Sequence, residues 1–255
     1  MPKRKLEDIG GAIAEFEQIK KRRPNRQLAR QKLIDAAHSV MSKSGLDGCT
    51  ISEIVAAARV GSGSFYNNFD SKEHLARVVF ESMIDELGKS IADVALFADD
   101  PAIAACFAIR TVIEKAERDT VWGAFMIQLE PTLRLLDAHL RKYAQLGMRQ
   151  GVEKGRFVVA DQKVTVTLLH TMEVGVIGAM LRQEISSRQA HASVEYMLRM
   201  LGVPQAEAAE YANLSMDELR RRANAGDDAP TRRRLKRDID VSSVAVRRGQ
   251  RQLPS

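Results

Sequence analysis

The chain has 255 residues, of which 45% are hydrophobic and 28% charged, and its formal net charge is +6. This length is natural for two domains, and the apolar fraction is enough to build a core. Two cysteines are too few for a secreted disulfide scaffold, and no Cys/His cluster has zinc-ligand spacing. No apolar run approaches the ~20 residues that span a bilayer. We therefore expect a cytoplasmic protein with no membrane span, no metal and no cofactor.

The positive charge lies at the two ends of the chain. Residues 1–30 and 231–255 carry net charges of +5 and +6, so the residues between them carry −5. Basic ends of this kind suit contact with a polyanion such as DNA. Solvated, disordered tails have the same composition, so both interpretations stay open.

Helical periodicity dominates the sequence, and no segment alternates convincingly with a period of two. The first apolar stripe, at spacings of three and four, comprises Leu6, Ile9, Ile13, Phe16 and Ile19. It leads into a basic run over residues 20–26, where Pro24 should break the helix. A second helix is predicted over residues 27–44, with Gly45 as its stop.

Residues 50–75 predict two short helices joined by a tight turn. The helices fall at about 52–58 and 62–68, and Ser71 caps a longer helix that follows. Thr50 and Glu53 have the spacing of a capping box, in which each satisfies a backbone N–H near the other. Phe65 and Phe69 supply a small core. Two short helices held in this way form a helix-turn-helix, the unit that places its second helix in the major groove of DNA.

The outward face of the second short helix is small and polar. A face selected for solubility alone would more often carry Glu and Lys, whereas a face pressed into a groove needs close approach and hydrogen-bond donors. The residues on this face are Ser62, Gly63, Ser64, Tyr66, Asn67 and Asn68.

The second half of the chain is also predicted to be helical. The expected helices lie at about 101–118, 121–129, 131–151, 161–184 and 188–201, with short ones between 204 and 225. Asp100 precedes a proline at the first helical position, and Asp161 caps a later helix. Ser215 and Glu218 again have capping-box spacing. Beyond residue 226 the composition predicts disorder.

An ordered set of residues in the first half resembles the TetR family of one-component bacterial regulators, over roughly residues 27–90. The set comprises Thr50, Gly63, Tyr66, Phe69, Ser71, Lys72, Glu73 and Leu75. The resemblance implies an all-α protein, in which a three-helix helix-turn-helix domain precedes a larger helical domain for ligand binding and dimerisation. The implied divisions are a basic N-terminal extension over 1–26, partly helical or disordered, a DNA-binding domain over 27–90, a regulatory domain over 91–203, and a basic extension over 204–255.

The same resemblance assigns roles to individual DNA-binding residues. It implies that Thr50, Ser62 and Lys72 contact phosphates, that Tyr66 lies along the DNA backbone, and that Ser64 and Asn67 read bases. Arg59 stands where many family members have a glycine, which costs stability if the turn is left-handed there but adds a potential phosphate contact. The remaining candidates for DNA contact are Gly63 and the basic run Lys21, Arg22, Arg23 and Arg26.

The ligand and interface residues in the second half are predicted from weaker patterns than the DNA-binding residues. Residues of the ligand type more often form plain core, and the interface glycines could instead face a pocket or relieve crowding. A mostly apolar cavity with a few polar groups would be lined by Trp122, Met126, Tyr143, His170 and Glu173. Residues proposed for a dimer interface, because small side chains permit close helix contact, are Gly175, Gly178 and Ala179, together with Met197.

The function predicted from these patterns is a ligand-responsive repressor that binds a double-stranded DNA operator as a homodimer. The effector would be an unidentified small molecule and the operator palindromic, because a symmetric dimer reads two half-sites. One alternative is a constitutive or architectural regulator that uses its basic tails. An enzyme is the other, but the sequence has no nucleophile motif or phosphate loop, only Glu173 and His170 at helical spacing.

Overall fold

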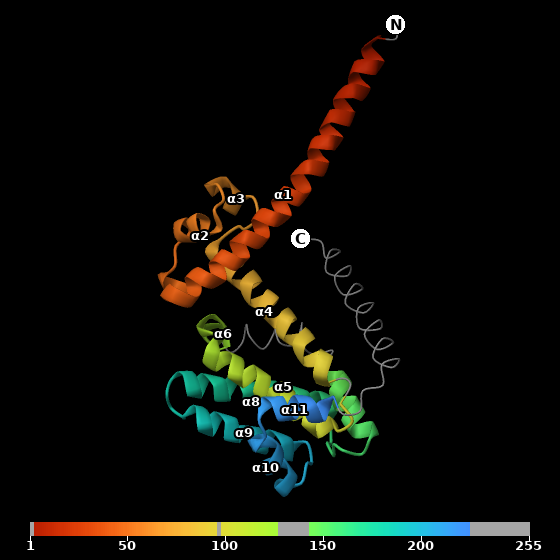
Figure 1. Cartoon of the computed structure of the whole chain (residues 1–255), viewed down its shortest axis with the longest axis vertical. Coiled ribbons are helices and arrows are strands. Elements are labelled where there is room, and N and C mark those ends of the chain that lie inside the picture. Colours follow the sequence, from red (N-terminus) through yellow and green to blue (C-terminus); the bar gives the residue numbers. More distant parts are fainter. Residues whose placement is uncertain (1–2, 96–97, 127–142, 225–255) are drawn as a thin grey trace.

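The structure, a computed structural model, describes the backbone of residues 3–95, 98–126 and 143–224, and side chains from residue 25 onward. Within these ranges every regular element is a helix and there are no strands, as the periodicity predicted. Figure 1 shows two units, with α1, α2 and α3 at one end and α5 to α11 at the other. The long helix α4 runs from the first unit into the second.

The first unit comprises α1 (Lys3–Gly48), α2 (Ile51–Ala58), α3 (Ser62–Tyr66) and the first turns of α4 (Lys72–Ala95). Its core is formed by fully buried apolar side chains from all four helices, among them Leu33, Ile54, Phe65, Phe69 and Leu75. Because these positions recur at helical spacing along the sequence, the elements and their inward faces were predictable.

Helix α1 differs from the prediction at its start. The break predicted at Pro24 is wrong, since α1 continues through it from Lys3. A proline removes one backbone hydrogen bond and disfavours the helix locally, but helix-forming residues on both sides can carry the helix across it. The stop predicted at Gly45 is confirmed as a departure from helical geometry, with φ 76° and ψ 171°.

The second unit contains α5 (Pro101–Arg118), α6 (Thr120–Met126), a helical stretch over 143–153, α8 (Gln162–Leu181) and α9 (Ser187–Met200). The caps predicted at Asp100 and Asp161 are confirmed, because their side chains accept from the N–H groups of Ala102 and Val164. Helix α5 is central: it packs against α4, α6, α8, α9 and α11.

The expectation that no apolar run approaches the length of a membrane span is wrong for α8, which by length and composition alone could cross a membrane. In this fold α8 is a core helix. It packs against α5, α6 and α9, and its buried face includes Val166, Val174 and Ile177.

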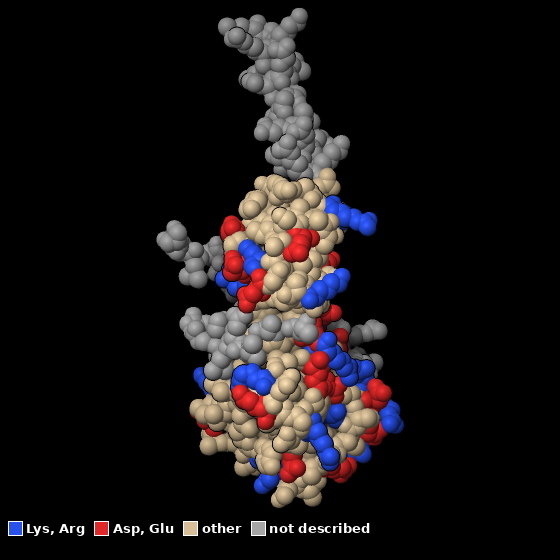
Figure 2. Space-filling view, turned by 90° about the vertical axis from the view of Figure 1, so that its left-hand side faces the viewer, with Lys and Arg blue, Asp and Glu red and all other residues tan. Residues whose placement is uncertain are grey.

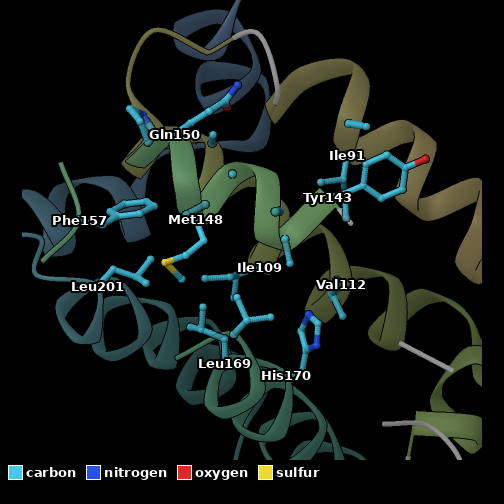
Figure 3. A pocket seen from close by; sticks show the side chains of 18 of the residues that line it. Ile91, Ile109, Val112, Tyr143, Met148, Gln150, Phe157, Leu169, His170 and Leu201 are labelled. Atoms are coloured by element: carbon cyan, nitrogen blue, oxygen red, sulfur yellow. The ribbon is translucent and has the colours of Figure 1, made fainter. Parts of the chain in front are cut away.

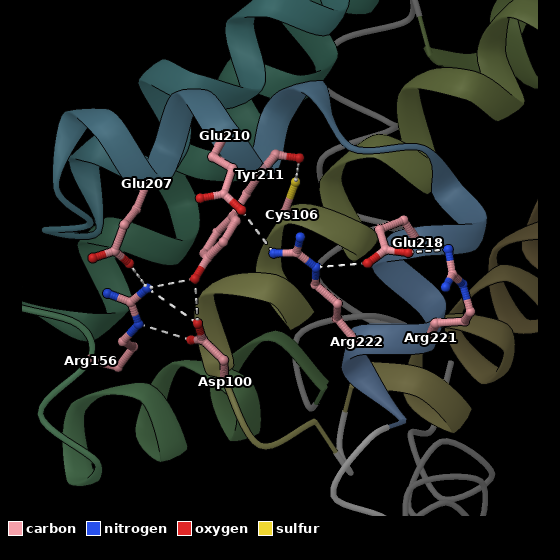
Figure 4. Close-up of polar contacts among 9 residues, drawn as sticks. All are labelled: Asp100, Cys106, Arg156, Glu207, Glu210, Tyr211, Glu218, Arg221 and Arg222. Atoms are coloured by element: carbon pink, nitrogen blue, oxygen red, sulfur yellow. Dashed lines mark hydrogen bonds and ion pairs between the residues drawn. The ribbon is translucent and has the colours of Figure 1, made fainter.

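Two short helices, α10 (Gln205–Asn213) and α11 (Met216–Ala223), follow as predicted and pack on α9 and α5. Figure 4 shows the polar contacts that fasten α10. Arg156 pairs with Asp100 through Nε–Oδ1 at 2.9 Å and with Glu207, while the Tyr211 hydroxyl donates to Asp100 Oδ2 at 3.0 Å.

The capping box predicted at Ser215 is only half formed. Ser215 Oγ accepts from the N–H of Glu218 at 3.1 Å, but the Glu218 carboxylate pairs with Arg221 and Arg222 instead of returning to the cap. The predicted disorder beyond residue 226 lies outside the described residues.

Candidate DNA-binding surface and ligand cavity

The helix-turn-helix begins at a complete capping box, as the sequence predicted. Thr50 Oγ1 accepts from the N–H of Glu53 at 3.2 Å, and Glu53 Oε2 accepts from the N–H of Thr50 at 2.8 Å. The hydrogen bonds from Thr50 hold the pKa of Glu53 below its ordinary value, so the carboxylate stays charged near the start of α2. Thr50 itself is exposed.

The turn between α2 and α3 contains the strained residue. Arg59 has φ 52° and ψ 47°, the left-handed conformation, which most residues other than glycine avoid. The sequence had indicated a cost at this position if the turn were left-handed, and it is. The Arg59 side chain is exposed beside the start of α3.

Helix α3 presents most of its polar residues to solvent. Tyr66 is 67% exposed and packs edge-on against the buried Phe65, with ring centroids 5.2 Å apart. Exposed alongside it are Ser62, Gly63 and Asn67, while Ser64 is half-buried. Asn68 differs, because its side-chain amide donates to the Ser64 carbonyl at 2.7 Å.

Two predicted phosphate-binding residues have protein partners in this structure. The Lys72 ammonium lies 3.2 Å from the Leu46 carbonyl and 3.1 Å from that of Cys49, so it ties the start of α4 to the α1–α2 turn. Arg26 donates to the Asn67 carbonyl at 2.5 Å, joining α1 to the end of α3. Phosphate contacts by these two residues stay predictions. Lys21, Arg22 and Arg23 lie on α1, but their side chains are outside the described ones.

Surface charge is mixed over the second unit. On the face that Figure 2 shows, blue Lys and Arg atoms and red Asp and Glu atoms are interspersed there and do not gather into one patch. Over the described residues of this face, the second unit therefore offers no large basic surface of the kind that DNA requires.

A cavity of about 130 Å³ lies inside the second unit. Figure 3 shows side chains converging on it from α4, α5, the 143–153 helix and α8, with Ile91, Ile109, Met148 and His170 among them. Ile91 is notable because α4 also carries the helix-turn-helix core. The cavity thus touches the helix that joins the two units.

The five predicted pocket residues divide between cavity and core. Tyr143, His170 and Glu173 line the cavity. Trp122 and Met126 are not among its lining residues and are fully buried in the core, where Trp122 packs on Phe80 with centroids 5.1 Å apart. Sequence alone could not separate the two groups, because both have the spacing of an inward helix face. The same limit hid Met148 and Phe157, which also line the cavity.

Glu173 is an unusual residue for such a place. Only 7% of it is exposed, and burial raises the pKa of its carboxyl to about 8. Ionisation of a carboxyl is disfavoured when it is removed from water without a compensating charge, so the pKa of Glu173 rises.

The predicted interface residues are also divided. Gly175 is exposed, with nothing within 4 Å of where a Cβ would stand, whereas Gly178 is buried beneath the Arg182 guanidinium. Ala179 is half-buried, and Met197 is fully buried in the core, so it has no surface to offer a partner. Large apolar side chains that sequence reasoning missed are exposed on α8 and α9: Val164, Leu168 and Tyr196.

Comparison with protein families gives two matches. The model described as "Bacterial regulatory proteins, tetR family" matches residues 33–79, from the buried part of α1 through α2 and α3 to the first turns of α4. The model described as "Tetracyclin repressor-like, C-terminal domain" matches residues 100–214, from the cap of α5 to the end of α10.

Similar proteins agree with these matches. The chain is 34% identical over 74 residues to the HTH-type transcriptional repressor DhaR of Mycobacterium sp. (strain GP1), covering 29% of this chain and 37% of DhaR. It is 36% identical over 58 residues to the repressor KstR2 of Rhodococcus jostii (strain RHA1), covering 23% of this chain and 28% of KstR2. These matches span about a third of the relatives' length.

Among solved structures, the fold is similar to RolR in complex with its ligand resorcinol. The identity is 30% and the TM-score 0.65, over 75% of this chain and 96% of RolR. The likeness therefore extends through both units.

Proposed function

The chain belongs to the TetR family of bacterial transcriptional regulators, and from this premise we propose that it is a ligand-responsive repressor acting as a homodimer on a palindromic operator. The observation that carries the proposal is the exposed polar face of α3. Tyr66, Ser62 and Asn67 stand on a helix that a buried core and a capping box hold outward. Such a face can enter a major groove and meet both phosphates and base edges.

Dimerisation is supported by the apolar surface of α8 and α9. Val164 is 55% exposed, Leu168 47% and Tyr196 61%, an unusual set for a surface that meets only water. Val164, Leu168 and Gly175 recur at spacings of four and seven, so they share one face of α8. A second copy of the chain, placed on this face, would bring two α3 helices to one DNA molecule, with half-sites about 34 Å apart.

The cavity is the proposed effector site. An apolar cavity of about 150 Å³ in another protein accepts benzene, so about 130 Å³ suits a molecule built on a single ring. RolR, whose structure contains the one-ring compound resorcinol, is the similar protein that supports this size.

Two contacts offer a route from the cavity to the DNA-binding unit. Gly88, Ile91 and Ala92 of α4 line the cavity, and the other half of α4 packs into the helix-turn-helix. In addition, His38 of α1 lies 3.2 Å from Asp119, whose carboxylate also accepts from the N–H groups at the start of α6. A ligand that shifts α4 or α6 would alter the spacing of the two α3 helices, at a coupling free energy of typically ~1–3 kcal/mol.

The experiment is a selection of bound duplexes from a random-sequence DNA library, using the full chain at physiological salt. The proposal predicts enrichment of a palindrome with half-sites about ten base pairs apart. Tyr66→Ala should weaken binding to that duplex, while Glu86→Leu, at an exposed position on α4, should not. No enrichment of any sequence over the starting library would refute the proposal.

The second candidate, an architectural regulator that uses basic tails, is favoured by one observation. Helix α1 continues through residues 3–24, so the basic run at 20–26 extends from the DNA-binding unit as a helix. Deleting residues 1–26 and 227–255 should then remove most of the salt dependence of DNA binding. An unchanged dependence on salt would exclude these tails as phosphate contacts.

A further inference from the structure

The buried carboxyl of Glu173 carries an inference about the ligand itself. Glu173 lines the cavity and is 7% exposed, and among the described residues its carboxyl takes part in no hydrogen bond or ion pair. Buried polar groups are nearly always paired, because an unpaired one loses its hydration without compensation. Glu173 sits in the wall of a cavity, so a bound molecule can provide the missing partner.

Apart from Tyr143, Gln150 and His170, the rest of the described wall is apolar. Its residues include no lysine or arginine, and the titratable groups that accompany Glu173 are His170, from the same helix, and Tyr143. Most of the other side chains are aliphatic, such as Ile91, Ile109 and Met148. Little in this wall would compensate the negative charge of an acidic ligand.

We propose that Glu173 anchors the effector, and that the effector is an uncharged one-ring molecule whose hydroxyl group hydrogen-bonds to the Glu173 carboxyl: a phenol. This inference rests on the proposed function, since it takes the cavity to be the effector site. The ring fills the apolar space, and the hydroxyl both donates to and accepts from the carboxyl.

Charge selects among ligands of the same size. A benzoate would have to lose the hydration of its charge in a wall whose described side chains include no lysine or arginine and a single histidine, His170. A benzylamine would form a buried ion pair, which requires two charged groups to lose their hydration. A phenol loses little hydration, and the raised pKa of Glu173, about 8, leaves its carboxyl mostly protonated at neutral pH, ready to pair with a neutral group.

The test is isothermal titration calorimetry of the full chain at pH 7 with four one-ring probes: phenol, resorcinol, benzoate and benzylamine. The two phenols should bind at least tenfold more tightly than benzoate and benzylamine. Glu173→Leu should weaken resorcinol binding at least tenfold, because it removes the hydrogen-bonding group. Glu173→Gln, whose amide can still donate and accept, should stay within a few fold of the unchanged chain. Glu86→Leu, the same kind of substitution at an exposed position, should have no effect.

Several results would overturn the proposal. These are benzoate or benzylamine binding as tightly as phenol, an unchanged resorcinol affinity in Glu173→Leu, or no binding of either phenol at millimolar concentration. Circular dichroism of each variant establishes that the fold is retained, and Glu173→Gln keeps the test valid if Glu173→Leu does not fold. The DNA selection distinguishes failure of this proposal from failure of the proposed function. If a palindrome is enriched but the phenols do not bind, only the ligand class is contradicted. If no sequence is enriched, the proposed repressor function is contradicted.

Discussion

At the scale of single residues, Arg59 occupies a turn position where glycine would be more favourable for the stability of the fold. Its left-handed conformation costs a non-glycine residue ~1–2 kcal/mol, and part of this is recovered because arginine has less freedom than glycine in the unfolded chain. Arg59 is exposed beside α3, the helix proposed to read DNA, so the phosphate contact predicted for it would offset this cost.

Arg59→Gly should therefore separate stability from DNA affinity. We expect the free energy of unfolding in urea to rise by about 0.5–1 kcal/mol, since glycine relieves the strain. Operator affinity should fall, and the slope of log affinity against log salt concentration should decrease in magnitude by about 1, because one cation that contacts phosphate is lost. Arg59→Lys keeps the charge and serves as the control. A Gly variant with unchanged or lower stability would show that the turn is not strained.

Glu173 makes the stability of the chain depend on pH. Its pKa is 4.5 in the reference state and about 8 when folded, so between these values the unfolded chain releases a proton that the folded chain keeps. Stability therefore falls as pH rises through this window, whereas below pH 4.5 both states are protonated and the carboxyl has no such effect.

Glu173→Gln removes this titration and should stabilise the chain most at high pH. At about pH 8.5 the gain should be on the order of 2–4 kcal/mol, at ~1.4 kcal/mol per pKa unit, and near pH 4.5 it should be close to zero. Thermal unfolding of both proteins across this range measures it. A gain that is independent of pH would contradict ionisation as the cause.

The contacts that the sequence predicted correctly are those between residues close together in the chain. Thr50 and Glu53, or Asp100 and its helix, interact within three residues, so spacing alone reveals them. Lys72 meets carbonyls 23 to 26 residues away, and Arg156 meets groups 51 to 56 residues away, which no periodicity encodes. Trp122 is buried in the core whereas Glu173 lines the cavity, and this difference depends on how the helices pack together, which spacing along the chain does not reveal.

At the scale of elements, the polar cluster of Figure 4 fastens α10 to the start of α5. Burial alone would raise the pKa of Asp100, but hydrogen bonds from Arg156, the Ala102 N–H and Tyr211 outweigh it and hold the pKa below its usual value. Arg156, 22% exposed at its side chain, is the residue that joins Asp100 to Glu207.

Arg156→Met should leave two carboxylates without their cation. We expect a loss of about 1–3 kcal/mol in the free energy of unfolding, measured with chemical denaturant. Arg182→Met is the matched control, because its ion pair with Glu184 is 55% exposed on both sides and should contribute under ~1 kcal/mol. Equal effects from the two variants would show that the cluster does not hold α10.

The exposed face of α8 gives a test of the dimer. Gly175 has open space around its Cβ position, so Gly175→Leu leaves the protomer undisturbed but would obstruct a second copy packed on this face. Sedimentation equilibrium should show the variant as a monomer at concentrations where the unchanged chain and Glu86→Leu are dimers. A dimer of undiminished affinity would place the interface elsewhere.

At the scale of the whole molecule, α4 makes the two units interdependent. It supplies the buried Leu75 to the core of the helix-turn-helix, packs Phe80 against Trp122 and Phe125 of α6, and lines the cavity with Ile91. A rigid helix that contacts the helix-turn-helix at one end and the cavity at the other can couple DNA binding to ligand binding. The coupling is reciprocal, so a ligand that weakens DNA binding is itself bound less tightly by the DNA complex.

The most direct measurement is fluorescence anisotropy of the full chain on its selected palindrome, with and without a phenol that calorimetry shows to bind. We expect saturating phenol to weaken DNA binding by about 5- to 150-fold, the range typical of an allosteric coupling free energy of ~1–3 kcal/mol. An operator affinity that stays unchanged while the phenol is demonstrably bound would contradict the central claim that this chain is a ligand-responsive repressor.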